Sequence, residues 1–145
     1  MEIRPLTRAE TVLAAAIHRE ARRSAMPWLP ELHSPAEDRA HFREHVYESC
    51  TLLGAFAPEC QGFLALAPGW VEHLYVAPAH QGQGLGHALL TEAQAQQDAL
   101  QLWCFARNQR ALDFYRAHGF TEAERTDGRG NAENEPDIRL VWRRS

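Results

Sequence analysis

The segment over residues 74–90 constrains the fold more than any other part of the sequence. It runs from an apolar stretch into three closely spaced glycines, Gly82, Gly84 and Gly86, and then into alanines and leucines at helical spacing. This order predicts a strand that enters a helix through a glycine-rich turn. Glycines let the backbone approach an anion, and the first N–H groups of a helix have no partner within it. The segment therefore predicts a diphosphate site.

The spacing of these glycines does not fit the common nucleotide motifs. A Gly-x-Gly-x-x-Gly motif that started at Gly82 would need glycine at position 87, where the chain has His87. One that started at Gly84 would need glycine at position 89, where the chain has Leu89. The turn also lacks the Gly-Lys-Ser/Thr ending of a mononucleotide P-loop. Nicotinamide, flavin and ATP sites are therefore not indicated.

Apolar periodicity and capping signals predict the remaining elements. Capping boxes at Thr7 with Glu10 and at Ser34 with Glu37 start two helices, which should end before Pro27 and near Glu48. Further helices are expected over residues 87–99 and 108–118, and strands over 51–57, 62–67, Trp70–Val76, 100–105, 120–125 and 138–142. The order β-α-α-β-β-β-α-β-α-β-β requires at least one parallel strand pair. We expect an α+β fold with a mixed sheet, in one domain over residues 1–145.

Composition excludes several classes of partner. The chain has 145 residues and a net charge of −4, and no basic run exceeds two residues, which argues against nucleic-acid binding. No secretory signal is present, and no stretch approaches the ~18 apolar residues of a membrane span. The three cysteines, Cys50, Cys60 and Cys104, form no Cys-x-x-Cys pair and suit a reducing compartment. The sequence thus favours the cytoplasm and predicts no membrane contact.

Two motifs together resemble those of the Gcn5-related N-acetyltransferase (GNAT) family. The first is Gln81-x-x-Gly84-x-Gly86, preceded by Leu-x-Val-x-Pro, and the second is Asn108 followed by Phe-Tyr and Gly-Phe. They fall in the family's order on the matching elements, and the resemblance runs from about residue 2 to residue 143. It implies a GNAT fold, with a mixed sheet of six to seven strands flanked by four helices. It also implies an N-acetyltransferase that uses acetyl-CoA, needs no metal and acetylates a primary amine by direct attack.

The resemblance also implies which residues bind coenzyme A. Its pyrophosphate would lie on backbone amides of the turn, and its pantetheine arm would bond to the preceding strand like an added strand. The cofactor-binding residues expected on this basis are Leu74, Tyr75, Val76, Gln81, Gly82, Gln83, Gly84, Leu85, Gly86, His87 and Asn108. Asn108 is also a good helix N-cap, and both roles can hold together. Gln81 stands where the family often has arginine, which puts the affinity for the cofactor in doubt.

Two residues are expected to act in catalysis. Tyr115 corresponds to the family tyrosine that protonates the departing thiolate, although its spacing from Leu112 also fits a core aromatic. Strand alternation puts Glu72 on one face with Trp70, Leu74 and Val76, and puts Val71, His73 and Tyr75 on the other. Glu72 is therefore the expected general base, reached through water, with an exposed, merely solvated carboxylate as the alternative. His73 is the weaker candidate, and Cys104 is expected to be structural.

Two other functions remain as alternatives. His41 and His45 belong to a His-x-x-Glu-His match that occurs in zinc hydrolases, but a solvated helix face explains it better. A non-catalytic acyl-CoA sensor or partner module on the same fold is the main alternative to an enzyme.

The acceptor is not identified by the sequence beyond a small-molecule or peptide amine. Residues 26–33 and 125–137 correspond to family regions that wall the acceptor pocket, where Trp28 and Trp70 could supply an apolar wall. Six acidic residues near the C-terminus could favour a cationic amine, although a solvated acidic loop is the commoner explanation. The resemblance further suggests a homodimer.

Overall fold

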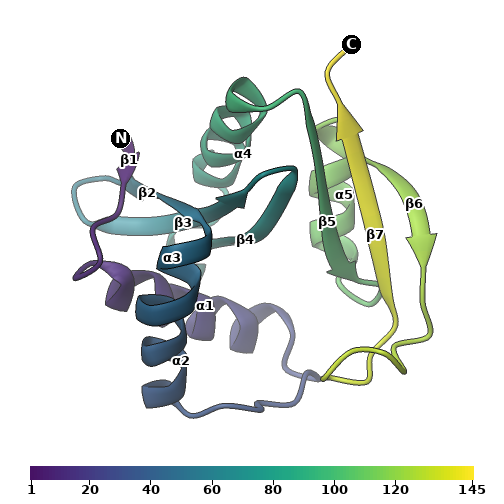
Figure 1. The fold of residues 1–145 in the computed structure, drawn as a ribbon, viewed down its shortest axis with the longest axis horizontal. Coiled ribbons are helices and arrows are strands. Elements are labelled where there is room, and N and C mark those ends of the chain that lie inside the picture. The colour runs from purple at the N-terminus through teal and green to yellow at the C-terminus, as the bar shows by residue number, and fades with distance from the viewer.

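A computed structural model describes residues 1–145 and contains one seven-stranded sheet with helices on both faces (Figure 1). Besides a short 3-10 helix at Pro78–His80, the chain has four helical segments, of which three are single helices and one is continuous over residues 35–49 through a π-helical turn. The strands are β1 (Glu2–Pro5), β2 (Thr51–Phe56), β3 (Cys60–Ala67), β4 (Trp70–Val76), β5 (Ala99–Phe105), β6 (Thr121–Arg125) and β7 (Asp137–Arg143). The helices are α1 (Thr11–Ala25), α2 (Pro35–His41), the π-helical turn Phe42–Val46, α3 (Tyr47–Ser49), α4 (Leu85–Gln96) and α5 (Gln109–Ala117).

The sheet is mixed, as the sequence predicts. Its strand order is β1-β2-β3-β4-β5-β7-β6, and β4–β5 is its parallel pair. The remaining neighbours are antiparallel and share between four and seven partner positions. The order of the elements also agrees with the sequence-based expectation.

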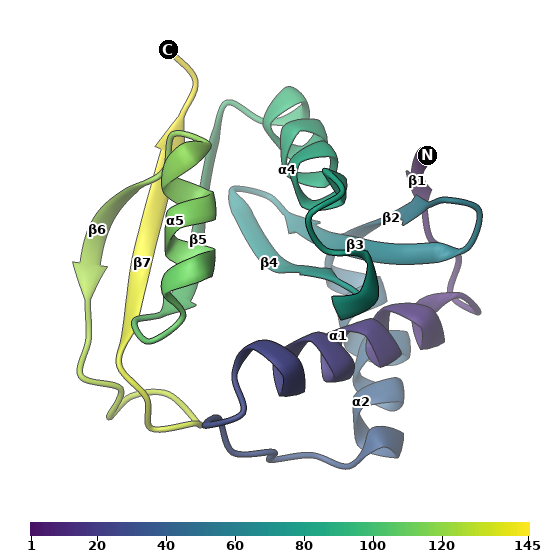
Figure 2. The ribbon, with the colours of Figure 1, turned by 180° about the vertical axis from the view of Figure 1, so that it is seen from behind.

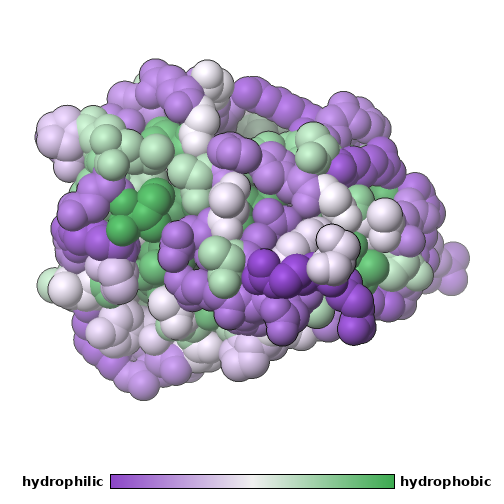
Figure 3. Space-filling view, turned by 90° about the horizontal axis from the view of Figure 1, so that it is seen from above, coloured by the Kyte–Doolittle hydropathy of each residue, from purple (hydrophilic) through white to green (hydrophobic).

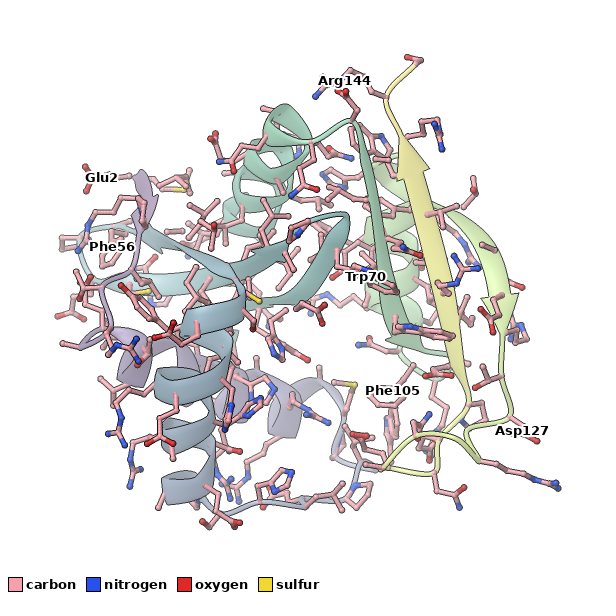
Figure 4. All side chains as sticks on the ribbon, in the orientation of Figure 1. Glu2, Phe56, Trp70, Phe105, Asp127 and Arg144 are labelled. Atoms are coloured by element: carbon pink, nitrogen blue, oxygen red, sulfur yellow. The ribbon has the colours of Figure 1, made fainter.

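Strands β4 and β5 touch at one end and separate at the other. Their one partner pair is Trp70 with Gln101, next to a hydrogen bond of 2.9 Å from the Gln101 N–H to the Gly69 carbonyl. The side chain of Gln97 closes this end further, because it accepts from the Gly69 N–H (2.6 Å) and donates to the Ala67 carbonyl (3.1 Å). Figures 1 and 2 show the two strands diverging from this point. In Figure 4 Trp70 lies near the closed end and Phe105 at the far end of β5.

Two hydrophobic cores lie on opposite faces of the sheet. The larger contains 16 buried residues and packs α4 and α5 against the strands, with Leu64, Leu89 and Leu140 fully buried. The smaller contains nine buried residues and packs α1 and the helical segment over residues 35–49 on the other face, around Phe42 and Phe63. Figure 2 shows α4 and α5 in front of the sheet. Apolar side chains thus hold a helical layer on each face.

Hydrophilic side chains cover most of the face seen from above, where apolar residues form smaller groups (Figure 3). None of the helices has both the length and the apolar character needed to cross a membrane.

Several element ends differ from the expectation. The Thr7–Glu10 capping bonds form (3.0 and 3.3 Å), but they close a turn and α1 begins only at Thr11. The capping box at Ser34 starts α2 as predicted. The hairpin loop is shorter than expected, because β3 already begins at Cys60. Helix α4 ends at Gln96 rather than near residue 99, since Gln97 leaves the helix and bonds to the β3–β4 turn.

The predicted alternation of side chains along β4 is wrong at its beginning. The pairs Leu66–Val71 and Ala65–His73 leave Glu72 without a partner, so that Glu72 forms a β-bulge. Val71 consequently lies in the core under α4, on the face that Leu74 and Val76 share. His73 and Tyr75 face α1 instead. The expectation that Val71 shares their face is therefore incorrect, and the argument that put Glu72 beside Leu74 loses its basis.

Candidate active site

A cavity of about 340 Å³ lies where β4 separates from β5. Every residue expected to bind the cofactor lines it except Gln83, and the expected acid Tyr115 lines it too. The structure therefore brings together residues from β4, the glycine turn and α5 that are far apart in the sequence. Residues that were not anticipated complete the wall, namely Ala21, Ala25, Met26, His80, Arg110, Ala111 and Phe114.

The glycine turn presents free backbone N–H groups to this cavity. Gly82 and Gly84 have φ angles of 80° and 83°, a left-handed conformation that glycine adopts without strain. The first hydrogen bond within α4 runs from the Ala88 N–H to the Gly84 carbonyl (3.0 Å), and no side chain caps the helix. The N–H groups of residues 85–87 therefore have no helical partner, and the positive end of the helix dipole adds to them. This arrangement suits an anion.

The backbone of β4 offers a second set of free groups. Tyr75 pairs with Phe63 of β3. Two residues further along the chain, the Ala77 N–H donates to the Gln61 carbonyl (2.8 Å). In an antiparallel ladder the hydrogen-bonded positions alternate, so the N–H and C=O groups of Leu74 and Val76 point away from β3. They face the gap, because β5 does not pair with β4 there. The Gln81 side chain donates to the Val76 carbonyl (3.1 Å), and the other groups remain available.

Asn108 and Tyr115 bring side chains from α5 to the same cavity. The Asn108 side chain accepts from the Ala111 N–H (3.3 Å), so it caps α5 while it also lines the cavity. Tyr115 packs on the rings of Phe114 and Phe120. Its hydroxyl makes no hydrogen bond within the chain, and burial raises the pKa of this phenol well above its ordinary value of 10. Tyr115 thus keeps its proton and points it to no internal acceptor.

A second cavity, of about 460 Å³, opens on the other side of β4 and shares Met26 with the first. Helices α1 and α2 supply part of its wall, and both loop regions expected at an acceptor pocket contribute, through residues 26–27, 29–33 and 132–133. Trp28 and Trp70 do not line it. The Trp28 ring instead lies under the Arg107 guanidinium (4.3 Å) and beside Phe105. We call this space the acceptor cavity.

Two histidines form the inner wall of the acceptor cavity. The rings of His18 and His73 lie 5.2 Å apart, and His18 also packs on Phe42 (5.3 Å) and Tyr75 (5.0 Å). Burial lowers the pKa of His18 from 6.5 to about 3 and that of His73 to about 4, with smaller contributions from neighbouring cationic groups, including Arg22. Both rings are neutral at pH 7. Because the unfolded chain binds their protons more readily, they reduce stability as the pH falls from 6.5 towards 4.

Glu72 lies outside both cavities. The residue is exposed, and its side chain forms no hydrogen bond or ion pair within the chain. Burial raises the pKa of the Cys50 thiol, and the Glu72 charge adds to this effect, which places the carboxylate near the start of β2. Its role as base stays a prediction.

Other candidates from the sequence are placed more clearly. Cys104 is buried on β5, and burial raises its pKa to about 12, so it carries no thiolate at neutral pH. His41 and His45 stack at 5.5 Å on the exposed face of a helix. No group of three or more His, Cys, Asp or Glu side chains is arranged to hold a metal ion.

The acidic residues near the C-terminus are largely neutralised by arginines. Glu122, Glu124 and Glu135 each pair with one at 2.8–3.0 Å. Of the whole group, Glu133 alone lines the acceptor cavity. These residues therefore do not form an acidic wall around it.

Sequence reasoning missed His18 and Arg22, which line the acceptor cavity from α1. One signal for His18 was present: it stands at helical spacing between Ala14 and Ala21, in the buried stripe of the helix. A polar residue in an otherwise apolar stripe indicates a functional or specifically paired position. Nothing in the local sequence distinguishes Arg22 from Arg19 or Arg23.

Comparisons with known proteins agree with this geometry. The model of the acetyltransferase (GNAT) domain matches residues 46–122. The peptidyl-lysine N-acetyltransferase YiaC of Escherichia coli (strain K12) is 29% identical over 118 aligned residues, covering 70% of this chain and 81% of that protein.

Solved structures resemble the whole chain. Apo YjaB from Escherichia coli has a TM-score of 0.80 at 20% identity, over 99% of this chain and 98% of its own. YncA from Salmonella typhimurium, solved with its cofactor acetyl-CoA, has a TM-score of 0.75 at 18% identity, over 100% and 94%. At such identities these likenesses establish the fold, which is the one that the two sequence motifs imply. Since the family match spans more than half of the 145 residues, the chain belongs to the GNAT acetyltransferase family.

Proposed function

We propose that this protein transfers the acetyl group of acetyl-CoA to a primary amine by direct attack, without an acyl-enzyme. The observation that carries the proposal is the cavity between β4 and β5, where free backbone groups of a strand meet free N–H groups of a helix start. The relatives' names point the same way, since YiaC acts on peptidyl-lysine and a Vibrio cholerae structure with a TM-score of 0.73 is a spermidine N-acetyltransferase.

Coenzyme A fits the two sets of free groups in turn. Its pyrophosphate would accept hydrogen bonds from the N–H groups of residues 85–87, and its pantetheine amides would pair with Leu74 and Val76 as an added strand. The Gln81 side chain is bonded to the Val76 carbonyl and adds no charge, so the backbone supplies most of the binding. The thioester would then lie between the two cavities, near Tyr75 and Met26.

Direct attack balances without a protein nucleophile. The amine nitrogen forms a bond to the thioester carbonyl carbon, the C–S bond breaks, and the thiolate takes the Tyr115 hydroxyl proton. The proton lost by the amine passes to a base on the acceptor side and from there to solvent, which returns a proton to the Tyr115 phenolate. The high pKa of Cys104 speaks against an acyl-cysteine step.

His73, the residue that follows the bulge in β4, is the base in our proposal. Glu72, the expected base, is exposed and would be reached only through water. His73 is neutral at pH 7 and lines the acceptor cavity, so its imidazole is the better placed group. A base weaker than the amine suffices here, since the nitrogen becomes more acidic than a free ammonium group once it bonds to the acyl carbon.

We further propose that residues 1–145 act as one domain, in the cytoplasm. Both cores share a single sheet, and all three cysteines are free, which suits a reducing compartment. The homodimer stays a prediction.

Substitution of Gly84 tests the diphosphate site. A Gly84→Ala change should weaken coenzyme A binding by about 10- to 100-fold, the cost of disturbing hydrogen bonds to a charged group, as measured by calorimetry. Gly69→Ala is the matched control, because Gly69 also has a positive φ (77°) and open space around an added Cβ, but lies outside both cavities. Both variants should lose about 1–2 kcal/mol of stability. Equal affinities in the two variants would contradict the site.

Substitution of Tyr115 tests the acid. Tyr115→Phe should lower kcat by about 100-fold, the usual contribution of a general acid, with acetyl-CoA binding nearly unchanged. Because burial raises the pKa of this phenol, the wild-type kcat should show no alkaline loss from it up to about pH 9. A Phe variant with wild-type kcat would remove Tyr115 from the mechanism. An absence of thiol release with every amine, despite tight binding of acetyl-CoA, would favour the sensor alternative.

The base is tested by comparing His73→Gln with Glu72→Gln. We expect the His73 variant to lose about 100-fold in kcat/KM and the Glu72 variant less than about threefold. Because this base acts after attack, the His73 deficit should remain as the pH rises towards the amine pKa of about 10, where the free amine forms without help. Melting curves check that both variants are folded. If the Glu72 variant then loses more kcat/KM than the His73 variant, Glu72 is the base.

A further inference from the structure

The charged side chains around the acceptor cavity are mostly engaged with one another. Arg19 binds Asp38 (3.0 Å) and Glu31 (3.2 Å), and Arg23 binds the same Glu31 (2.7 Å). Glu37 is held by the Ser34 N–H (2.8 Å) in the α2 capping box. These groups form the outer wall of the cavity and have little left to offer a ligand.

Arg22 is the exception. Its nearest carboxylate is Glu133, at 4.0 Å, which is longer than a hydrogen-bonded ion pair. Its one other polar contact is the Nε2 atom of His18, at 3.4 Å. The side chain is only 26% exposed, yet a guanidinium carries five N–H donors that all seek acceptors. Most of its hydrogen-bonding capacity is therefore unused within the chain.

His18 is unsatisfied in the same wall. A guanidinium can only donate, so in the contact with Arg22 the His18 Nε2 accepts and the ring proton lies on Nδ1. This Nδ1 is buried and has no hydrogen-bond partner, in a residue that is 8% exposed. Two neighbouring donors on α1 thus lack acceptors within the chain, which is a costly arrangement. Of the two, Arg22 is the one that a ligand in the cavity can reach, because its side chain is partly exposed.

The charge of Arg22 also acts on the groups around it. It contributes to the lowered pKa of both His18 and His73, so its guanidinium lies close to the inner end of the cavity. The same positive field disfavours an ammonium group and favours a neutral amine. An acceptor whose charged groups are all cationic, such as a polyamine, would find no attractive charge at the inner end of the cavity. An anionic group would be attracted to Arg22 there.

We propose that the acceptor is a small amine that carries a carboxylate, an amino acid or a close analogue, and that Arg22 binds this carboxylate. The inference rests on the proposed acetyl transfer and adds the class of acceptor. Arginine binds carboxylates with two parallel hydrogen bonds, and Arg22 has the free donors for them. The cavity volume of about 460 Å³ is in the range of small-molecule sites. The carboxylate would replace Glu133 as the partner of Arg22 and leave the amine directed at His73.

The test uses acceptors that differ in the carboxylate alone. Thiol release from acetyl-CoA is measured with the common amino acids and with their carboxamides, which keep the same α-amine and side chain. We expect at least one amino acid to exceed its amide in kcat/KM by about 10- to 100-fold, as for other charge-assisted contacts. The α-amine of the amide has the lower pKa, so a larger fraction of it is neutral and reactive at pH 7. A higher kcat/KM for the amino acid must therefore come from its carboxylate.

Substitution of Arg22 completes the test. Arg22→Gln should remove the preference by raising KM for the amino acid, with little effect on the amide, and Arg22→Lys should restore it only in part. Arg39→Gln, which removes the same charge from an exposed position on α2 outside the cavity, should match the wild type. Two results would overturn the inference. One is an equal kcat/KM for the amino acids and their carboxamides, and the other is a preference for the amino acid that remains in the Arg22→Gln variant. A lysine peptide and spermidine are also tested as acceptors. If these alone are acetylated, the proposal of a carboxylate-bearing acceptor is refuted and the proposed acetyl transfer stands. If no amine is acetylated, the proposed acetyl transfer itself is refuted.

Discussion

The separation of β4 from β5 is the constraint on which the rest of the structure depends. The two strands are joined at Trp70 and Gln101, and the Gln97 side chain fixes the adjoining turn through Gly69 and the carbonyl of Ala67. From this closed end the sheet opens, and the backbone of β4 loses the partner that a parallel strand would provide. An opening in the middle of a sheet exposes polar groups that must be satisfied, so it persists where a ligand satisfies them. The extended pantetheine arm has the shape and the amides to do so.

Side-chain alternation after the bulge at Glu72 determines which side chains border this opening. Leu74 and Val76 face the cavity under α4, while His73 and Tyr75 face α1. The bulge adds Val71 to the side of Leu74 and Val76. The acyl donor and the amine can therefore approach the same strand from opposite faces. In our proposal they meet near Tyr75 and Met26, with the proposed proton donor Tyr115 on one side and neutral His73 on the other. In the proposed mechanism, the two faces of this one strand thus separate the two halves of the reaction.

The backbone-based parts of the site could be predicted from the sequence, because local signals determine them. Glycines at 82, 84 and 86 before a helix indicate a turn whose backbone can approach a ligand closely, and Asn108 is a preferred N-cap that indicates the start of another helix. The bulge could not be predicted, since it arises from the register between β3 and β4 rather than from Glu72 itself. The roles of His18 and Arg22 depend on which groups α1 meets across the cavity, and their distances to Glu133 and His73 follow only from the folded chain. The sequence therefore predicted most of the residues that meet in the cavity between β4 and β5, but it missed His18 and Arg22 in the acceptor cavity.

Amide hydrogen exchange with and without saturating coenzyme A tests the central claim most directly. We expect the N–H groups of Leu74 and Val76 to exchange quickly in the free protein and to become protected when coenzyme A binds, together with those of residues 85–87. The Tyr75 N–H, which pairs with β3, should be protected in both states and serves as the internal reference. If coenzyme A binds and the Leu74 and Val76 amides keep their exchange rates, the cofactor does not complete the sheet and the account is contradicted.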